Sequence, residues 1–411
     1  MKIPRIIFTT PVLEHPAAGG PQLRIENSIK ALNKISELHI ISRVSPGGIG
    51  SQDDIAYIKN ICNLLNYSPS ANEKKTLFKK ILNKLLPNNP KRKLKKDVNY
   101  IYKYALKINA DIIWFGYGNI SFPLIKELRI LLPKTVFVCD TDSVWSRFIL
   151  RELDVEENPS RRQEIEKEGK AKELEEKDNS SICDITTAVS EIDAIYYRGI
   201  APDANRIHIF SNVIDLDTYV SPPLPPSDFK SPSIFIGGSY YSSNSPMVHA
   251  ANWVIKEIMP FVWKKYPTAH VYIVGRGGEE FCSELTCDNV TITGKVPSVL
   301  PYLCNSICSL VPLSFESGTR YKILESGACG IPVVSTTLGA EGIPVKNGND
   351  CLIADSADDF ANAIIKLLDD SELRKQLGNN CKELIKKHYS IDSLVQEANA
   401  VFSYLNKCRN K

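Results

Sequence analysis

A proline-rich segment at residues 220–232, VSPPLPPSDFKSP, separates two stretches of chain that open in the same way. Proline lacks the backbone N–H donor and fixes φ, so this composition is typical of a stiff linker and continues neither a helix nor an inner strand. Residues 3–9 are an apolar run, followed by a Gly-Gly loop, a helical stretch near 21–33 and a second strand near 38–42. The pattern restarts at residues 234–236 with Gly-Gly-Ser and another helical stretch. This alternation predicts a doubly wound parallel sheet on each side of the linker.

A length of 411 residues suits two domains, with three possible. We therefore predict an α/β protein with a Rossmann-like domain at residues 1–220, a proline-rich linker at 221–232 and a second Rossmann-like domain at 233–388. Residues 389–411 are expected to form a C-terminal helix that could pack back on the N-terminal domain. No G-x-G-x-x-G motif opens either half, which argues against a dinucleotide-dependent dehydrogenase.

The charge and cysteine patterns exclude several classes of protein. A net charge of +3 predicts no general attraction to nucleic acid or to membranes. The N-terminus lacks a signal-peptide pattern, and no apolar stretch approaches the ~18 residues of a membrane-spanning helix. The eleven cysteines are scattered without a C-x-x-C pair, which favours a cytoplasmic protein with reduced thiols and no metal site.

Residues 75–86, KTLFKKILNKLL, form a basic exception to the small net charge. Their apolar residues recur at helical spacing, and Lys79, Lys80 and Lys84 lie on the opposite face. The pattern predicts an interfacial helix for an anionic membrane surface, with the protein peripheral at the inner face of the cell membrane. The alternative is a helix packed on the N-terminal domain with its lysines in water.

Charged residues concentrate at residues 314–343, between two apolar strands. We expect the preceding strand to end near residue 312 and a helix to begin near Thr319, whose side chain would cap it. A helix start at the carboxyl edge of a parallel sheet is an anion site, and Arg320 and Lys322 add positive charge to it. The stretch therefore predicts a diphosphate site.

Glu325 lies three residues after Lys322, where its carboxylate could accept hydrogen bonds from a ribose diol. The alternative is that Lys322 and Glu325 form a surface ion pair and that Gly330 is only a helix C-cap. The local pattern leaves both interpretations open.

Residues 312–343, PLSFESGTRYKILESGACGIPVVSTTLGAEGI, resemble the nucleotide-sugar signature of glycosyltransferase family 4. The resemblance extends to residues 234–278, which look like the first βαβ of the family's sugar-donor domain, to 211–215 (SNVID) and to 184–190 (DITTAVS). It implies the GT-B fold, with two Rossmann-like domains facing each other across a cleft. It also implies a nucleoside-diphosphate sugar as co-substrate, transfer with retention of the anomeric configuration and no metal cofactor.

The chain departs from the family's E-x7-E pair. The second glutamate matches Glu325, but eight residues earlier stands Ser317, and Glu316 is one position off. The Arg and Lys that many relatives carry after the first donor-domain strand are also absent from GGSYYSSNSP. We infer that Arg320 and Lys322 supply this positive charge for the leaving diphosphate. The predicted donor-binding residues are Gly20, Gly238, Ser239, Gly275, Thr319, Arg320, Lys322 and Glu325. The predicted catalytic residues are Asp142, Glu316 and Lys322.

Two N-terminal segments resemble the acceptor side of the family. Residues 11–24 resemble its glycine-rich first loop, in which glycines let backbone amides approach a ligand. Residues 136–147 (VFVCDTDSVWSR) contain a D-x-D, which is the metal-binding signal of the other glycosyltransferase fold, GT-A, but resembles an acceptor-facing segment of this branch. The predicted acceptor-side residues, without metal, are His15, Gly19, Asp140, Asp142 and Arg147. The alternatives are a loop histidine without a role for His15 and a strand-end carboxylate satisfied within the fold for Asp140.

The sequence as a whole predicts a hexosyltransferase-like enzyme that moves a sugar from a nucleoside diphosphate to a hydroxyl acceptor. The acceptor would be a glycan or a lipid-linked glycan in surface polysaccharide or glycolipid biosynthesis, and nucleic acid is not an expected partner. Two alternatives are another GT-B enzyme, such as a nucleotide-sugar epimerase, and a catalytically weak nucleotide-sugar-binding protein.

Overall fold

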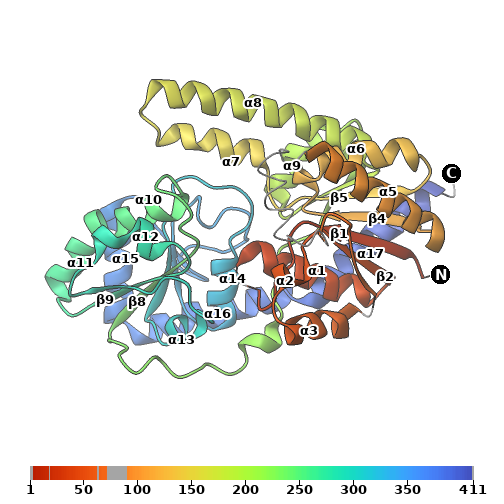
Figure 1. Ribbon diagram of the computed structural model, residues 1–411. Helices are drawn as coiled ribbons and strands as arrows, with labels where there is room; N and C mark the ends of the chain where they lie inside the picture. The colour runs from red at the N-terminus through yellow and green to blue at the C-terminus, as the bar shows by residue number, and fades with distance from the viewer. Residues whose placement is uncertain (1–2, 18, 63, 72–89, 410–411) are drawn as a thin grey trace, which may run out of the picture. The chain divides into compact units, whose positions relative to one another are not determined.

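The structure, a computed structural model, describes residues 3–17, 19–62, 64–71 and 90–409. It forms two compact units (Figure 1). Unit 1 comprises Met1–Ser146, Glu168–Ser211 and Leu394–Lys411, and unit 2 comprises Arg147–Lys167 and Asn212–Ser393. Contacts thus group the proline-rich segment with unit 2, and most of the C-terminal helix with unit 1. The predicted interfacial helix at residues 75–86 lies outside the described residues.

Unit 1 is built on a parallel sheet of seven described strands in the order β3-β2-β1-β4-β5-β6-β7. The strands are β1 (Arg5–Thr10), β2 (Glu37–Ser42), β3 (Leu65–Tyr67), β4 (Ile112–Gly116), β5 (Val136–Asp140), β6 (Ile185–Ala188) and β7 (Ile207–Ile209). The helices are α1 (Gly20–Asn33), α2 (Pro46–Ile49), α3 (Gln52–Cys62), α5 (Pro90–Ile108), α6 (Phe122–Leu131), α7 (Trp145–Arg151), α8 (Pro159–Ile182), α9 (Glu191–Ile200) and α17 (Ile391–Arg409), the ranges of α7, α8 and α17 extending into unit 2.

Apolar side chains cover both faces of the unit 1 sheet, as expected for buried parallel strands. On one face, helices α5 and α6 pack against β4 and β5, where the rings of Phe115 and Phe137 lie 5.2 Å apart. On the other face, Trp114 packs on Phe210 at 4.9 Å. Helix α17 reaches the edge of the sheet through Tyr404, whose ring lies 5.0 Å from that of His208.

Unit 2 contains a parallel sheet of six described strands in the order β10-β9-β8-β11-β12-β13. The strands are β8 (Ser233–Gly237), β9 (His270–Val274), β10 (Val290–Ile292), β11 (Cys308–Val311), β12 (Val333–Ser335) and β13 (Leu352–Ile353). The helices are α10 (Pro246–Trp253), its π-helical continuation η5 (Val254–Ile258), α11 (Met259–Lys265), α12 (Gly278–Phe281), α13 (Leu300–Leu303), α14 (Tyr321–Ala328), α15 (Ala357–Asp369) and α16 (Ser371–His388). The predicted doubly wound α/β fold is confirmed in both units.

The order of the unit 2 strands reverses between β8 and β11. These strands are neighbours in the sheet, but the chain leaves β8 through α10 towards β9 and leaves β11 through α14 towards β12. Ligands of open α/β sheets bind outside the carboxyl ends of the strands at such a switch point. The loops after β8 and β11 are therefore where unit 2 should hold a ligand.

Two predicted donor-binding glycines bring the loops after β8 and β9 together. Gly275 has a φ of 138°, and a Cβ there would collide with the carbonyl oxygen of Gly238. Only glycine allows this approach.

No helix in the described ranges is both long and apolar enough to span a membrane.

Candidate functional site

Helix α14 begins later than predicted. Its N-cap is Arg320, without a side-chain capping bond, so the prediction that Thr319 caps the helix is wrong. Gly318 turns the chain with a φ of 81°, and helical backbone starts only at Tyr321, which leaves Thr319 one residue too early to reach the first-turn amides. The Thr319 hydroxyl instead accepts a hydrogen bond of 2.8 Å from the Asn212 amide.

Lys322 and Glu325 lie on α14, both partly buried. Burial lowers the pKa of Lys322 and raises the pKa of Glu325 to about 7. The Tyr219 hydroxyl, from the 3-10 turn η4 (Leu216–Tyr219), donates to Oε1 of Glu325 at 3.2 Å and partly offsets that rise. The two charged groups form no ion pair with each other in the part of the chain that the structure describes, so the surface-pair alternative does not describe this helix.

Arg320 is buried and bonds to backbone carbonyls. Its guanidinium donates to the carbonyl oxygens of Gly318 and Leu338, the latter at 3.4 Å. These bonds tie the loop after β11 to the loop after β12. The geometry thus supports a role in shaping the loop, and the contact of Arg320 with a diphosphate stays a prediction.

A second arginine, Arg151, joins the same two loops. Its guanidinium forms a bidentate ion pair with Glu341 at 2.8 and 2.7 Å and donates to the carbonyl oxygen of Glu316 at 2.6 Å. Burial alone would raise the pKa of Glu341, but the hydrogen bonds and charge of Arg151 outweigh it and hold that pKa below its usual value. Sequence reasoning missed Arg151, because 190 residues separate it from Glu341.

The position of the missing glutamate is occupied by a small buried hydroxyl. Ser317 is 7% exposed, and its Oγ has no hydrogen-bond partner among the described residues. Glu316, one position earlier, accepts a bond of 3.2 Å from the Ser317 amide through its own carboxylate. The carboxylate of Glu316 therefore remains beside the loop, and its predicted catalytic role is untested by this geometry.

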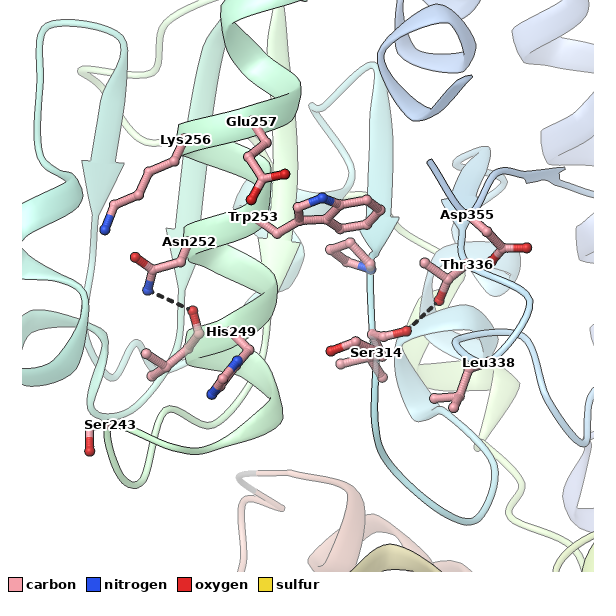
Figure 2. Close-up of a pocket in the computed structure, with 13 residues that line it drawn as sticks. Ser243, His249, Asn252, Trp253, Lys256, Glu257, Ser314, Thr336, Leu338 and Asp355 are labelled. Atoms are coloured by element: carbon pink, nitrogen blue, oxygen red, sulfur yellow. Dashed lines mark hydrogen bonds between the residues drawn. The ribbon is translucent and has the colours of Figure 1, made fainter. Parts of the chain in front are cut away.

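A cavity of about 730 Å³ opens at the carboxyl edge of the unit 2 sheet. Figure 2 shows side chains of α10 and η5 on one side of it and those of the loops after β11 and β12, with Asp355, on the other. It is lined by Ser243, Val248, His249, Asn252, Trp253, Lys256, Glu257, Pro312, Leu313, Ser314, Thr336, Leu338 and Asp355. None of the predicted site residues lines it. His249 and Trp253 escaped notice because, four residues apart, they look like the buried stripe of any amphipathic helix.

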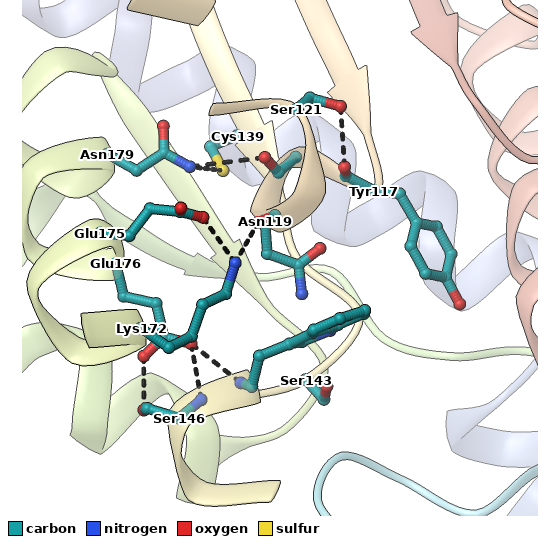
Figure 3. A network of polar contacts seen from close by, with 12 residues as sticks. Tyr117, Asn119, Ser121, Cys139, Ser143, Ser146, Lys172, Glu175, Glu176 and Asn179 are labelled. Atoms are coloured by element: carbon teal, nitrogen blue, oxygen red, sulfur yellow. Dashed lines mark hydrogen bonds and ion pairs between the residues drawn. The ribbon is translucent and has the colours of Figure 1, made fainter. Parts of the chain in front are cut away.

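In unit 1, Asp142 lies beside the polar network of Figure 3, in which Asn119 and Lys172 are labelled. It accepts hydrogen bonds from the Asn119 amide at 2.6 Å and the Trp145 indole at 3.0 Å. Burial raises the pKa of Asp142, and these two bonds partly offset the rise. Lys172 of α8 fixes the Asn119 backbone by donating to its carbonyl oxygen at 2.8 Å. The raised pKa makes this carboxylate a stronger proton acceptor than an ordinary aspartate.

Asp140 is fully buried at the end of β5. It pairs with Arg24 and accepts a bond of 2.9 Å from the Thr187 hydroxyl. Arg24 also donates to the carbonyl oxygen of Phe210 at 3.1 Å. These contacts all go to Oδ1, and Oδ2 is buried without a hydrogen-bond partner among the described residues, so the geometry matches the alternative of a strand-end carboxylate satisfied within the fold only in part. The described residues contain no cluster of three or more His, Cys, Asp and Glu side chains suited to a metal ion.

The structure also places the remaining predicted residues, each within its own unit. His15 contacts Glu26 at 2.9 Å and stacks on the Tyr57 ring at 3.9 Å. Gly19 is the N-cap of α1 and Gly20 its first residue. Ser239 is exposed after β8 and Arg147 lies in α7, grouped with unit 2. Their roles towards a donor or an acceptor stay predictions.

Comparison with known proteins agrees with this architecture. Residues 234–370 match the family described as Glycosyl transferases group 1. N-acetyl-alpha-D-glucosaminyl L-malate synthase of Bacillus anthracis is 29% identical over 146 residues, which cover 33% of this chain and 37% of that protein. The chain thus spans about a third of the length of the curated relatives it matches.

Two solved structures are similar over almost the whole chain. Sucrose-phosphate synthase from Thermosynechococcus elongatus superposes with a TM-score of 0.72 at 15% identity, covering 99% of this chain and 100% of that one. HepE of Anabaena, solved in complex with UDP and glucose, gives 0.66 at 12% identity, covering 97% and 99%. At these identities the likeness concerns the fold alone.

Proposed function

From its GT-B fold and its glycosyl transferases group 1 domain at residues 234–370, we propose that this chain is a glycosyltransferase that takes a nucleoside-diphosphate sugar as donor. The observation that carries the proposal is the start of α14. There the Lys322 ammonium has neither a hydrogen bond nor an ion pair within the described ranges, one turn from the partly buried carboxylate of Glu325. This combination of groups suits a diphosphate and its ribose.

Lys322 would act on the leaving group. As the bond between the sugar C1 and the phosphate oxygen breaks, negative charge grows on the diphosphate, and a cation already desolvated by burial stabilises that charge without reorganising. The helix N-terminus contributes only about half a charge. Ammonium and helix together offset most of the roughly two negative charges of a diphosphate.

Glu325 would hold the ribose. One of its oxygens is occupied by the Tyr219 hydroxyl, and the other has no hydrogen-bond partner among the residues that the structure describes, which leaves it for a ribose hydroxyl. This contact exists before and during the reaction, so it contributes to donor binding rather than to the chemical step.

The finer parts of the proposal rest on the resemblance to family 4. They are retention of configuration, a hydroxyl acceptor on a glycan or lipid-linked glycan, a role in surface polysaccharide or glycolipid biosynthesis, and activity without a metal ion. Asp142, Asp140, His15, Gly19 and Arg147 are assigned to the acceptor on the same basis. A peripheral membrane location through residues 75–86 is a further part of the proposal, which vesicle flotation tests.

An acceptor-dependence assay tests the function. The protein is incubated with UDP-, GDP- and ADP-sugars, with and without acceptor extracts, and the released nucleoside diphosphate is measured. A glycosyltransferase releases it in an acceptor-dependent manner. An epimerase converts the donor alone, and a binding protein shows a thermal shift with a nucleotide but no turnover.

A further inference from the structure

The cavity beside α10 contains two aromatic rings whose positions are fixed. The His249 ring lies edge-on to Phe315 at 5.3 Å, and the Trp253 ring lies edge-on to Phe360 at 5.5 Å. Both rings line the cavity from one helix face (Figure 2). Rigid amphipathic rings of this kind give a ligand an apolar surface with a polar edge.

The opposite wall is also held in place by hydrogen bonds. The Thr336 hydroxyl donates to the carbonyl oxygen of Leu313 at 2.7 Å and accepts from the Gly339 amide at 2.9 Å. Asp355 accepts two bonds, of 2.7 and 2.6 Å, from the amide and hydroxyl of Thr337. The cavity is therefore preformed, and about 730 Å³ is within the size range of a small-molecule site.

Several polar groups in the lining are available to a ligand. Within the described part of the chain, the His249 imidazole, the Trp253 indole N–H and the Ser314 hydroxyl have no hydrogen-bond partner. Together they offer both donors and acceptors beside apolar surface. A neutral polyhydroxylated ligand makes use of such a mixture.

The charges of the lining argue against an anionic ligand. Its cationic side chain, Lys256, is paired with Glu284 at 3.0 Å. Glu257 and Asp355 contribute two carboxylates. A phosphate or a uronic acid placed here would face like charges.

We propose that this cavity binds the glycosyl group of the donor, and that this group is a neutral sugar rather than an acidic one. The inference rests on the proposed function. Ser314 lines the cavity, Phe315 packs on the His249 ring, and Gly318 turns the same loop into α14, so this loop connects the cavity with the start of the helix that carries Lys322.

The test compares the affinity of each nucleoside diphosphate with that of its sugar conjugate. Calorimetry is performed with UDP and UDP-glucose, GDP and GDP-mannose, ADP and ADP-glucose, and with UDP-glucuronic acid. The variants are His249→Phe and Trp253→Phe, which keep the contacts with Phe315 and Phe360 and lose the polar atoms. Ser314→Ala is a milder third variant, and Trp263→Phe on α11 is the matched control outside the cavity.

In the wild type, at least one neutral sugar is expected to improve the affinity of its nucleotide by about tenfold. Each cavity variant should reduce that gain severalfold and leave the affinity for the nucleotide alone unchanged, and Trp263→Phe should keep the gain. UDP-glucuronic acid should bind no tighter than UDP.

Any of three results would overturn this inference and leave the proposed function standing. The first is an affinity improvement by the sugar that is unchanged in all three cavity variants. The others are an equal loss of affinity for the nucleotide and for the nucleotide sugar, and tighter binding of UDP-glucuronic acid than of UDP. The equal loss would place the base in the cavity. If no nucleotide binds at all to the folded wild type, the proposed function itself fails.

Discussion

The hydroxyl of Tyr219 donates a hydrogen bond of 3.2 Å to Oε1 of Glu325, and thereby connects the turn before the proline-rich segment to helix α14. Seven residues earlier, the side-chain amide of Asn212 donates a hydrogen bond of 2.8 Å to the hydroxyl of Thr319. The stretch from Asn212 to Tyr219 therefore positions both the loop and the helix of the proposed donor site.

Tyr219→Phe should raise the pKa of Glu325 above about 7, because the lost hydrogen bond favours the ionised carboxylate. Lys322 on the same helix lowers that pKa and remains in place. If the ribose contact needs the carboxylate, the pH above which donor binds tightly should move upward. The measurement is the donor KM between pH 6 and pH 9.

The matched control is Tyr266→Phe, which removes a phenol bond to the exposed carboxylate of Asp369. Tyr266→Phe should leave the pH dependence of the donor KM unchanged. If Tyr219→Phe gives the same pH dependence of the donor KM as the wild type, the hydrogen bond from Tyr219 does not set the pKa of Glu325.

Glu325 should also make stability depend on pH. Its pKa is raised in the folded state to about 7, so its contribution to stability is fully present below pH 4.5 and is lost as pH rises through 7. Glu325→Gln keeps an acceptor for Tyr219 and removes the titration. It should stabilise the protein at pH 8 by on the order of 2 kcal/mol relative to the wild type, and should have little effect at pH 4.5. Urea unfolding at both pH values measures the difference.

Lys322→Ala should slow the chemical step more than it weakens donor binding, because the charge it faces grows in the transition state. We expect a fall of roughly 100-fold in kcat with a smaller change in donor KM. Glu325→Ala should mainly raise the donor KM. Steady-state kinetics with circular dichroism as a folding check decide this, and near-normal values for both variants would place the site elsewhere.

Arg151→Ala should destabilise unit 2. It leaves the carboxylate of Glu341, whose side chain is 20% exposed, without its bidentate partner, at a cost of about 1–3 kcal/mol. The control is Arg198→Ala, which breaks the exposed pair with Glu191 and should cost less than about 1 kcal/mol. If denaturant unfolding gives the same loss of unfolding free energy for both substitutions, the contacts of Arg151 with the loops after β11 and β12 do not stabilise unit 2 as proposed.

The overall fold was predictable because it depends on local pattern, and the proposed donor site was placed on α14 for the same reason. Buried strands alternate with helices, and Lys322 and Glu325 stand at fixed spacing on one helix. The start of α14 was predicted near Thr319, but the positive φ of Gly318 turns the chain there and the helix begins only at Tyr321. Local spacing does not determine the positive φ of this turn.

The missed residues share a different cause. Tyr219 meets Glu325 across 106 residues of sequence, and Arg24 meets Asp140 across 116. Such pairs arise only when the sheet brings distant loops together, and a single sequence does not show which loops meet. The cavity was missed for the same reason, since its walls come from four separate stretches of chain.

The central claim is transfer of a sugar from a nucleoside diphosphate, and its most direct test is product formation from a radiolabelled donor. Wild-type protein and Lys322→Ala are incubated with each sugar-labelled nucleotide sugar and with membrane and polysaccharide extracts, with and without EDTA. The account predicts label in an acceptor fraction with the wild type, undiminished by EDTA and reduced roughly 100-fold in Lys322→Ala. Label that stays with the nucleotide or appears only as free sugar, or transfer that Lys322→Ala performs as well as the wild type, would contradict it.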